Sequence, residues 1–497
     1  MERAKITGEV EIASARFAKL KKEVSNLSEL KKKIEEFLSA SVTELVEIIL
    51  TGAICLDASD IHIEPEETQA KFRIRIDGVL NDVMNLNPKT YKSILSRIKL
   101  LSGLKLNVAD RPQDGRFTIS VSRATEKGRE EDLSSSTSRS LESETPGSVD
   151  ELRSSSATES RLRDEGGKKS EALFDFANAR VKENQGYTIE IRASALPAEY
   201  GESIVLRLLN PKNLIEIEAL GLRKDLTEIF KQEIKRPNGM IIVTGPTGSG
   251  KTTSLYAVLK RINKPEIKII TIEDPVEYRL GGLSQTQVDP SKGYTFASGL
   301  RSIMRQDPDV ILVGEIRDLE TAEIACQAAL TGHLVFSTLH TNDAAGAIAR
   351  LMDLGVKPIS IAPALNMVVA QRLPRKVCKK CAKSVPASPA DLKKIKKGLA
   401  GVKKEILPPS FFQTRPTIPQ AKGCEFCNFT GYKGRIGIFE TFLVDDQMEK
   451  FILTLPSIVA MKESAIKKGM VLMSQDGLIK VLEGTTTLEE IERVAGE

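Results

Sequence analysis

The 497-residue sequence contains no tryptophan, only three histidines and few aromatic side chains of any kind. It also lacks any apolar run approaching the roughly 18 residues that a membrane-spanning helix needs. Its first residues, MERAKITGEVEIASARF, have no apolar core of the kind found in a secretory signal peptide. We therefore expect a cytoplasmic protein that meets a membrane only through partner proteins.

The sequence also lacks a large excess of positive or negative charge. Lys and Arg together number 72 and Asp and Glu 67, which leaves a formal net charge of +5. An imbalance this small gives no strong case for nucleic acid or another polyanion as a partner. A chain of this length usually divides into more than one hydrophobic core, so we expect several domains.

Cysteines are few, and structural disulfides are not expected in a cytoplasmic protein. Cys55 and Cys326 stand alone among apolar neighbours and are interpreted as small buried side chains. The remaining four form two CxxC pairs, a pattern that suits a structural Zn²⁺ ion in tetrahedral coordination. A redox pair is the alternative, but no thioredoxin-like context surrounds either motif. The predicted zinc ligands are Cys378, Cys381, Cys424 and Cys427.

Composition divides the chain into segments. One segment, residues 123–184, is rich in serine and charge and cannot bury enough apolar area to offset its ordering entropy, so we predict a disordered insertion. The expected segments are a helical arm with a solvated polar face (1–40), a small α+β domain (41–122 and 185–212) interrupted by the insertion (123–184), a linker (213–225), an α/β domain (226–370), a cysteine-bearing subdomain (371–440) and a helical C-terminal region (441–497).

The segment from about Leu226 to Met367 alternates between strand and helix patterns. The runs MIIVTG, KIITIE, VILVGE and LVFST each lead into a helical pattern. This alternation predicts an α/β fold in which helices cover both faces of a parallel sheet.

The run GPTGSGKT matches the phosphate-binding P-loop and has a strand before it and a helix after it. Its backbone N–H groups and the helix N-terminus would hold phosphates. Lys251 would reach the β- and γ-phosphates of ATP, and the Thr252 hydroxyl would bind Mg²⁺. The predicted ATP- and Mg²⁺-binding loop is Gly245, Pro246, Thr247, Gly248, Ser249, Gly250, Lys251, Thr252 and Thr253.

Hydrolysis also needs carboxylates near the phosphates. Glu273 and Asp274 end the second predicted strand, and Glu315 follows the third, where ligands of open parallel sheets bind. We predict that Glu315 orients or polarises the attacking water. His340 follows the fourth strand and is interpreted as a γ-phosphate sensor or a residue that positions water. For His333, at the opposite end of that strand, a purely structural role remains equally open.

The motifs GPTGSGKTT, ITIEDPVE, LRSIMRQDPDVILVGEIRD and TGHLVFSTLHTNDA together resemble the Walker A, Asp box, Walker B and His box of the type II secretion and type IV pilus assembly ATPases. Upstream, ASDIHIEP, RIRIDG and RPQDGRF resemble the N-terminal domain of that family. The resemblance covers most of residues 43–122 and 186–497. It implies a RecA-like ATPase domain, a smaller PAS-like α+β domain and a homohexamer with ATP bound between domains.

The resemblance also assigns roles to residues. It implies that Glu315 is the catalytic glutamate, and that Glu273, Asp274 and Glu277 support metal and water. Arg192 and Arg207 match family arginines that reach the nucleotide from the N-terminal domain, a role that suits the planar guanidinium fork.

Two further arginines, Arg301 and Arg305, lie one helical turn apart and would share a face that could line the same site. A surface salt-bridge role is the alternative for both residues.

A paired CxxC element is typical of the family members that assemble or secrete rather than retract. The resemblance therefore implies a motor that extrudes pilin or pseudopilin subunits together with an inner-membrane platform protein. Type IV pilus assembly and type II secretion both remain open, as does the way the short N-terminal segment attaches to the machine.

Two other functions remain as alternatives. The runs KVCKKCAK and DLKKIKKGLAGVKK could belong to a nucleic-acid-translocating RecA-like ATPase, but the scarcity of aromatic residues disfavours nucleic-acid binding. The second alternative is a nucleotide-sensing scaffold that does not hydrolyse ATP, which the presence of Glu315 disfavours.

Overall fold

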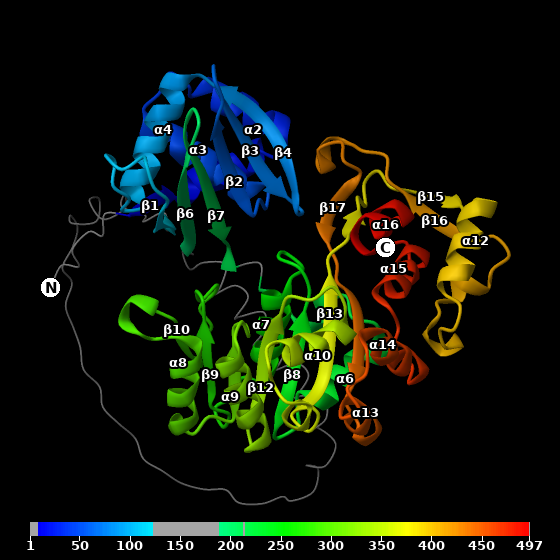
Figure 1. The fold of residues 1–497 in the computed structure, drawn as a ribbon. Helices are drawn as coiled ribbons and strands as arrows, with labels where there is room; N and C mark the ends of the chain where they lie inside the picture. Colours follow the sequence, from blue (N-terminus) through cyan, green and yellow to red (C-terminus); the bar gives the residue numbers. More distant parts are fainter. Residues whose placement is uncertain (1–7, 123–187, 212–213, 497) are drawn as a thin grey trace, which may run out of the picture.

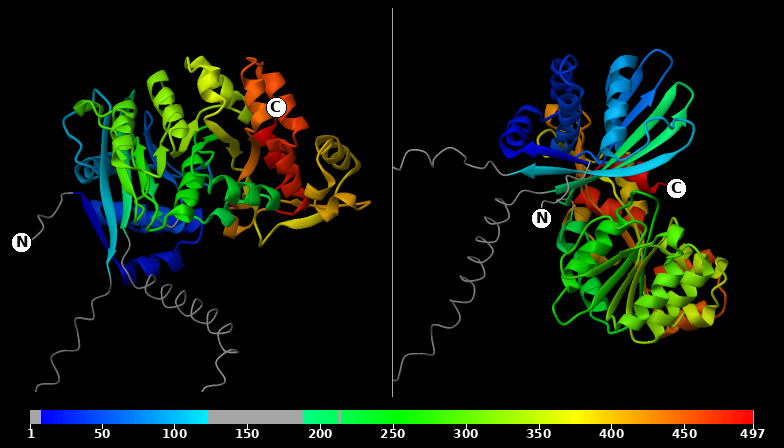
Figure 2. Two further views of the ribbon diagram at one scale, coloured as in Figure 1. Left: turned by 90° about the horizontal axis from the view of Figure 1, so that it is seen from below. Right: turned by 90° about the vertical axis from the view of Figure 1, so that its left-hand side faces the viewer.

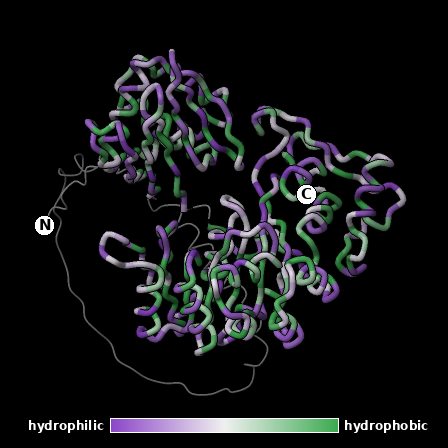
Figure 3. The backbone as a smooth tube through the Cα atoms, in the orientation of Figure 1, coloured by the Kyte–Doolittle hydropathy of each residue, from purple (hydrophilic) through white to green (hydrophobic). Residues whose placement is uncertain are grey.

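The computed structural model describes residues 8–122, 188–211 and 214–496. The predicted insertion at 123–184 lies outside these residues. Figure 1 shows an N-terminal domain above, an α/β domain below, and the cysteine-bearing segment with the C-terminal helices beside them. In Figure 3, hydrophobic segments run through the interior of both domains. Among the described residues, no helix is both long and apolar enough to cross a membrane.

The N-terminal domain contains a seven-stranded sheet in the order β1-β5-β6-β7-β2-β3-β4. Apolar side chains from alternate strand positions pack against four helices, and Figure 2 shows the sheet between these helices and the second domain. The elements are β1 (Glu9–Ala13), α1 (Ser14–Glu23), α2 (Leu27–Glu36), α3 (Val42–Cys55), β2 (Asp60–Pro65), β3 (Ala70–Ile76), β4 (Val79–Leu86), α4 (Pro88–Leu101), β5 (Gln113–Ser122), β6 (Thr188–Ala198) and β7 (Gly201–Leu209).

The first residues do not form the separate arm expected for 1–40. Strand β1 pairs in parallel with β5 and extends the sheet. Leu20, Leu30 and Ile34 are buried in the domain core rather than facing solvent. Their helical spacing indicated the helices, but the short run EVEIA gave no sign of a strand because its partner lies far along the chain.

The second sheet has the order β10-β9-β11-β12-β8-β13-β18 and is parallel except for β18. Separate apolar clusters lie on its two faces, which confirms the predicted α/β fold. The elements are α6 (Lys224–Glu233), β8 (Gly239–Thr244), α7 (Lys251–Ile262), β9 (Ile269–Glu273), β10 (Ser284–Gln287), α8 (Phe296–Ile303), β11 (Val310–Val313), α9 (Leu319–Leu330), β12 (Leu334–Leu339), α10 (Ala344–Asp353), α11 (Pro358–Ile361), β13 (Leu365–Arg372) and β18 (Ile438–Leu443).

The edge strand β18 lies outside the range expected for this domain. It pairs antiparallel with β13, so the cysteine-bearing segment is an insertion between two adjacent strands of one sheet. That segment and the C-terminal region comprise β14 (Arg375–Val377), β15 (Lys383–Pro386), α12 (Pro389–Gly398), β16 (Thr417–Gln420), β17 (Tyr432–Arg435), α13 (Asp446–Ile452), α14 (Ile458–Lys467), α15 (Met473–Leu482) and α16 (Leu488–Ala495).

The described part of the predicted linker is packed rather than extended. Ile217 and Leu220 are buried in the core of the α/β domain. Lys480 Nζ of α15 donates to the carbonyl oxygen of Gly221 at 2.6 Å, and Arg223 pairs with the buried Asp476 at 3.0 Å. The chain that joins the two domains is therefore attached to a C-terminal helix.

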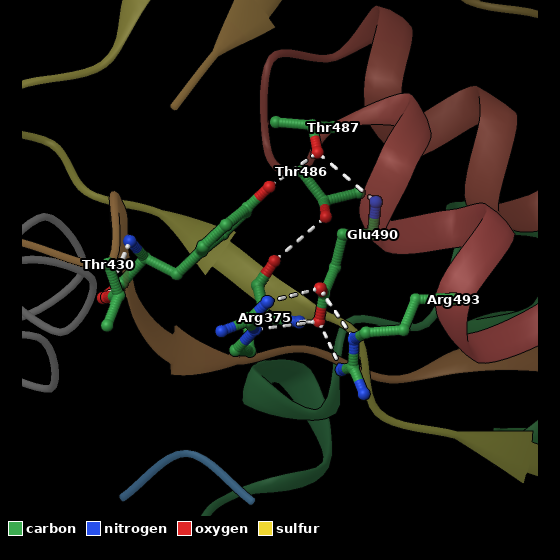
Figure 4. Close-up of polar contacts among 7 residues, drawn as sticks. Arg375, Thr430, Thr486, Thr487, Glu490 and Arg493 are labelled. Atoms are coloured by element: carbon green, nitrogen blue, oxygen red, sulfur yellow. Dashed lines mark hydrogen bonds and ion pairs between the residues drawn. The ribbon is translucent and has the colours of Figure 1, made fainter. Parts of the chain in front are cut away.

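A buried carboxylate attaches the last helix to the strand pair β14–β17 (Figure 4). Glu490 accepts from Arg375 Nε at 3.0 Å and Nη2 at 2.8 Å, and from Arg493 Nε at 2.9 Å. Tyr432 lies 4.3 Å from the Arg375 guanidinium and bonds through its hydroxyl to Thr487 at 2.8 Å. Burial opposes ionisation of Glu490, but the hydrogen bonds from Arg493 and Arg375 outweigh it and lower its pKa to about 2.

We predict that Glu490→Gln lowers the free energy of opening α16 by roughly 3 kcal/mol at pH 7. This figure follows from the lowering of the carboxyl pKa from 4.5 to about 2. Because the folded-state pKa is lowered, this stability is present above about pH 4.5 and is lost as the pH falls towards 2. Hydrogen exchange of α16 peptides at pH 7 and pH 3 measures the difference. Glu489→Gln, at the exposed neighbouring position, is the control and should change little.

Candidate nucleotide-binding site

A cleft of ≈ 1090 Å³ lies where three parts of the chain meet. One wall is the P-loop and the strand ends of the α/β domain. A second wall is the N-terminal sheet, and the third is the strand pair β14–β17, which carries Tyr432 and Arg435. Residues far apart in the sequence therefore surround one space of the size that ligand sites usually have.

The P-loop connects β8 to α7, as predicted. Gly250 has φ +88°, and a Cβ there would meet Gln371 Nε2 at 2.8 Å, so glycine suits both the backbone angle and the space. Gln371 holds the loop from the neighbouring strand β13. Its Nε2 donates to the Ser249 carbonyl at 2.8 Å, and its Oε1 accepts from Ser254 Oγ at 2.7 Å. Sequence reasoning missed Gln371 because no motif marks it.

Lys251 lies in the cradle of the loop. Its Nζ donates to the carbonyl oxygens of Gly245 at 2.8 Å and Pro246 at 3.3 Å. These two carbonyl oxygens accept the ammonium hydrogen bonds that phosphate oxygens would accept if a nucleotide were bound. Burial lowers the pKa of Lys251 from its usual value. Thr252 and Thr253 line the cleft beside it, whereas Gly245 and Pro246 do not.

Glu315, Asp274 and His340 converge next to the loop. His340 Nε2 lies 3.4 Å from Glu315 Oε2. Burial and the nearby Lys251 charge lower the pKa of His340, which favours the neutral imidazole. Arg317 contacts Glu315 directly, and its Nη1 lies 3.2 Å from Asp274 Oδ2. Sequence reasoning missed Arg317, whose only signal is its place two residues after Glu315.

The Glu273 side chain is buried, whereas its place in the sequence predicted a position at the open end of its strand beside the phosphates. Its carboxylate accepts hydrogen bonds from the Tyr256 hydroxyl, from Thr271 Oγ1 at 2.5 Å and from Gln285 Nε2 at 3.3 Å. Burial raises the pKa of Glu273 above its usual value. This carboxylate connects α7 to β9 and β10, so the structure gives it internal partners in place of an open metal-binding position.

The predicted arginines divide into two groups. Arg207 lines the cleft, and Arg192 crosses between the domains, where it donates to the Val276 carbonyl at 2.7 Å and pairs with Glu277 at 3.3 Å. The structure does not bring Arg301 and Arg305 to the cleft of the same chain. Instead, Arg301 pairs with Glu320 at 2.6 Å, and Arg305 donates weakly to Ser302 Oγ at 3.4 Å.

Two other residues weighed in the sequence have internal positions. His333 lies at the end of β12 away from the cleft, with Nδ1 3.0 Å from the Ala328 carbonyl oxygen, which is a structural contact. Cys326 is buried in the core, as the sequence predicted.

The four paired cysteines form one cluster whose sulfur atoms all lie within 4.8 Å of one another. Three separations are 3.9, 3.8 and 3.7 Å. A tetrahedral Zn²⁺ with bonds of about 2.3 Å places sulfur atoms roughly 3.8 Å apart, so the donor set fits the predicted metal. The backbone amides of Cys424 and Gly431 donate to Cys427 Sγ at 3.2 and 3.3 Å.

The chain matches the family model described as type II/IV secretion system protein over residues 35–139 and 177–493. It is 39% identical over 461 residues to the type II secretion system protein E of Pectobacterium carotovorum subsp. carotovorum, covering 92% of this chain and 76% of that relative. It is also 39% identical over 457 residues to the type IV pilus assembly ATPase PilB of Thermus thermophilus, covering 92% of this chain but only 43% of the relative's length.

The fold is similar to that of a solved structure, the ATPase DotB of Legionella pneumophila. The TM-score is 0.54 at 18% identity, over 90% of this chain and 95% of that one. This likeness concerns the fold alone, whereas the sequence matches extend through both domains and the cysteine-bearing segment. On these matches, the chain belongs to the type II/IV secretion system protein family.

Proposed function

We propose that the chain is a cytoplasmic motor ATPase that hydrolyses ATP to extrude pilin or pseudopilin subunits in type IV pilus assembly or type II secretion. The observation that carries the proposal is the convergence of Lys251, Glu315 and Arg207 on one cleft between two domains. Relatives named as a pilus assembly ATPase and as a type II secretion protein support this role.

In the proposed reaction, the P-loop amides and Lys251 hold the β- and γ-phosphates of ATP. Thr252 and Asp274 would hold Mg²⁺, which would neutralise charge on the phosphates. Glu315 accepts a proton from the attacking water, and the neutral His340 beside it orients that water. Arg317 balances the charge of Glu315 and Asp274, and the phosphates compete for it when ATP enters.

Movement follows from the position of the cleft. Charge-assisted bonds from Arg207 to the phosphates draw the N-terminal domain towards the P-loop, and hydrolysis with product release lets it withdraw. Arg192 already connects the domains through Val276 and Glu277. Repeated closure and opening would turn the chemical step into displacement of one domain relative to the other.

The working assembly is proposed to be a homohexamer that acts on an inner-membrane platform protein and remains peripheral to that membrane. A translocase of nucleic acid and a non-hydrolysing sensor are the alternative outcomes. Stimulation of hydrolysis by single-stranded DNA would favour the first of these. ATP binding without phosphate release would favour the second.

Lys251→Ala is expected to weaken ATP binding at least tenfold, roughly the effect of losing charge-assisted bonds to the phosphates. Isothermal titration calorimetry with MgATP measures the change. Lys260→Ala, on the same helix but paired with Glu216 outside the cleft, is the matched control. Equal affinities for both variants and the wild type would contradict the assignment of the loop.

Glu315→Gln is expected to bind ATP normally and to lower kcat by about a hundredfold or more, because it removes the proton acceptor for water. Steady-state phosphate release measures turnover. The control is Glu320→Gln, which removes a carboxylate that pairs with Arg301 on the surface. Wild-type turnover in Glu315→Gln would assign the chemistry to another residue.

The cysteine cluster is proposed to hold one structural Zn²⁺ per chain, detectable by metal analysis of the purified protein. Cys424→Ser combined with Cys427→Ser should release the metal and increase hydrogen exchange in β14 and β17, since the cluster joins the two chain segments that lead into this strand pair. Cys326→Ala should retain the metal. Well under one zinc in the wild type would oppose this assignment.

A further inference from the structure

A row of charged residues crosses the N-terminal sheet on the face that lines the cleft. In the strand register, Arg192 on β6 lies opposite Arg207 on β7, and Arg207 lies opposite Asp60 on β2. Asp60 in turn lies opposite Arg75 on β3, and Arg116 extends the row on β5. Side chains directly opposite each other in a sheet share a face, so this row presents four guanidinium groups and one carboxylate to the same side.

Asp60 contacts the two arginines on either side of it. Its Oδ1 accepts from Arg207 Nε at 3.0 Å, and its Oδ2 lies 3.4 Å from Arg75 Nε. The Asp60 side chain is only 7% exposed, whereas those of Arg207 and Arg75 are 54% and 36% exposed. One buried carboxylate therefore holds two arginines that reach into the solvent-filled cleft.

The contacts leave the phosphate-binding ends of these arginines available. Asp60 uses only the Nε atoms. The terminal nitrogens of Arg207 make no hydrogen bond to any described residue, and one terminal nitrogen of Arg75 donates to the Gly78 carbonyl at 3.2 Å. A carboxylate that binds Nε from the side fixes the guanidinium plane and leaves its terminal fork for a phosphate.

We propose that Asp60 is a positioning residue that aims Arg207 and Arg75 at the phosphate chain of the nucleotide, and that Arg75 is a further nucleotide-binding residue. The inference rests on the proposed ATPase function and adds to it a residue pair in the N-terminal domain. Asp60 itself does not touch the nucleotide and acts through the two arginines.

Electrostatics of the row support a ligand role over a purely structural one. Like charges directly opposite in a sheet repel, and one carboxylate cannot neutralise four guanidinium groups. Glu277 of the other domain neutralises part of the charge through Arg192. The remaining positive charge lies beside the P-loop cleft, where a triphosphate is the complementary partner.

The test uses the purified full chain with the variants Asp60→Asn, Arg75→Gln, the double variant that combines them, Asp60→Glu and the matched control Arg73→Gln. Arg73 lies on the same strand and face as Arg75 but pairs with Glu64 and does not line the cleft. Affinity for the non-hydrolysable analogue AMP-PNP, together with KM and kcat for ATP, is measured alongside the melting temperature.

Asp60→Asn and Arg75→Gln are each expected to raise the Kd for AMP-PNP and the KM for ATP about tenfold, with a smaller change in kcat. Arg73→Gln should stay within twofold of the wild type. Because Arg75 is aimed by Asp60, the double variant should be weakened by less than the product of the single effects. Asp60→Glu, which keeps the charge, should recover part of the affinity.

Unchanged Kd and KM in Asp60→Asn, with or without a lower melting temperature, would overturn the positioning role. Equal effects of Arg75→Gln and Arg73→Gln would overturn the assignment of Arg75. If Asp60→Asn does not fold, the comparison of the two arginine variants decides. A wild-type chain that binds AMP-PNP without releasing phosphate from ATP would refute the proposed function. The AMP-PNP Kd values of the variants would still test whether Asp60 and Arg75 contribute to nucleotide binding.

Discussion

The cleft depends on the parallel pairing of the strands β8, β9, β11 and β12. Their hydrogen-bonded register places Thr244 opposite Leu339 and Val313 opposite Ser337, so the carboxyl ends of the strands lie at one edge. The P-loop, Glu315 and His340 follow those ends directly. Shifting one strand along its neighbour would move Lys251 and Glu315 apart, and they would no longer line the same cleft. Backbone pairing in the buried sheet is thus the condition on which the chemistry of the site rests.

The sequence was sufficient to predict the parts of the site whose geometry is local. The P-loop curls within a single strand–turn–helix unit, and the two CxxC pairs carry their own spacing, so both were found. Arg317, Gln371 and Asp60 were not found, because each makes contacts with elements distant in the sequence. These are Asp274 for Arg317, Ser249 and Ser254 for Gln371, and Arg207 and Arg75 for Asp60. Glu273 was found, but its inward direction was not, since three donors from separate elements determine it.

The same difference between local and long-range contacts explains which strands could be predicted from the sequence. Four central strands of the α/β sheet have strong apolar patterns and were predicted. The strands β1 and β18 were not, because each joins its sheet beside a strand that an intervening segment separates from it in the sequence. Arg301 and Arg305 show the limit of helical spacing as a guide. Arg301 in α8 pairs with Glu320, whereas Arg305 lies beyond the end of α8 and donates to Ser302 Oγ, so neither lines the cleft of the same chain.

The attachment of the linker to α15 has a mechanical consequence. Gly221 and Arg223 are held by Lys480 and Asp476, and the same Asp476 accepts the backbone amide of Phe439 in β18 at 2.7 Å. A force on the linker is therefore passed directly both to α15 and, through Asp476, to the edge strand β18. Any pivot between the two domains must therefore lie upstream of Gly221, which leaves only a short stretch of chain between them that can bend.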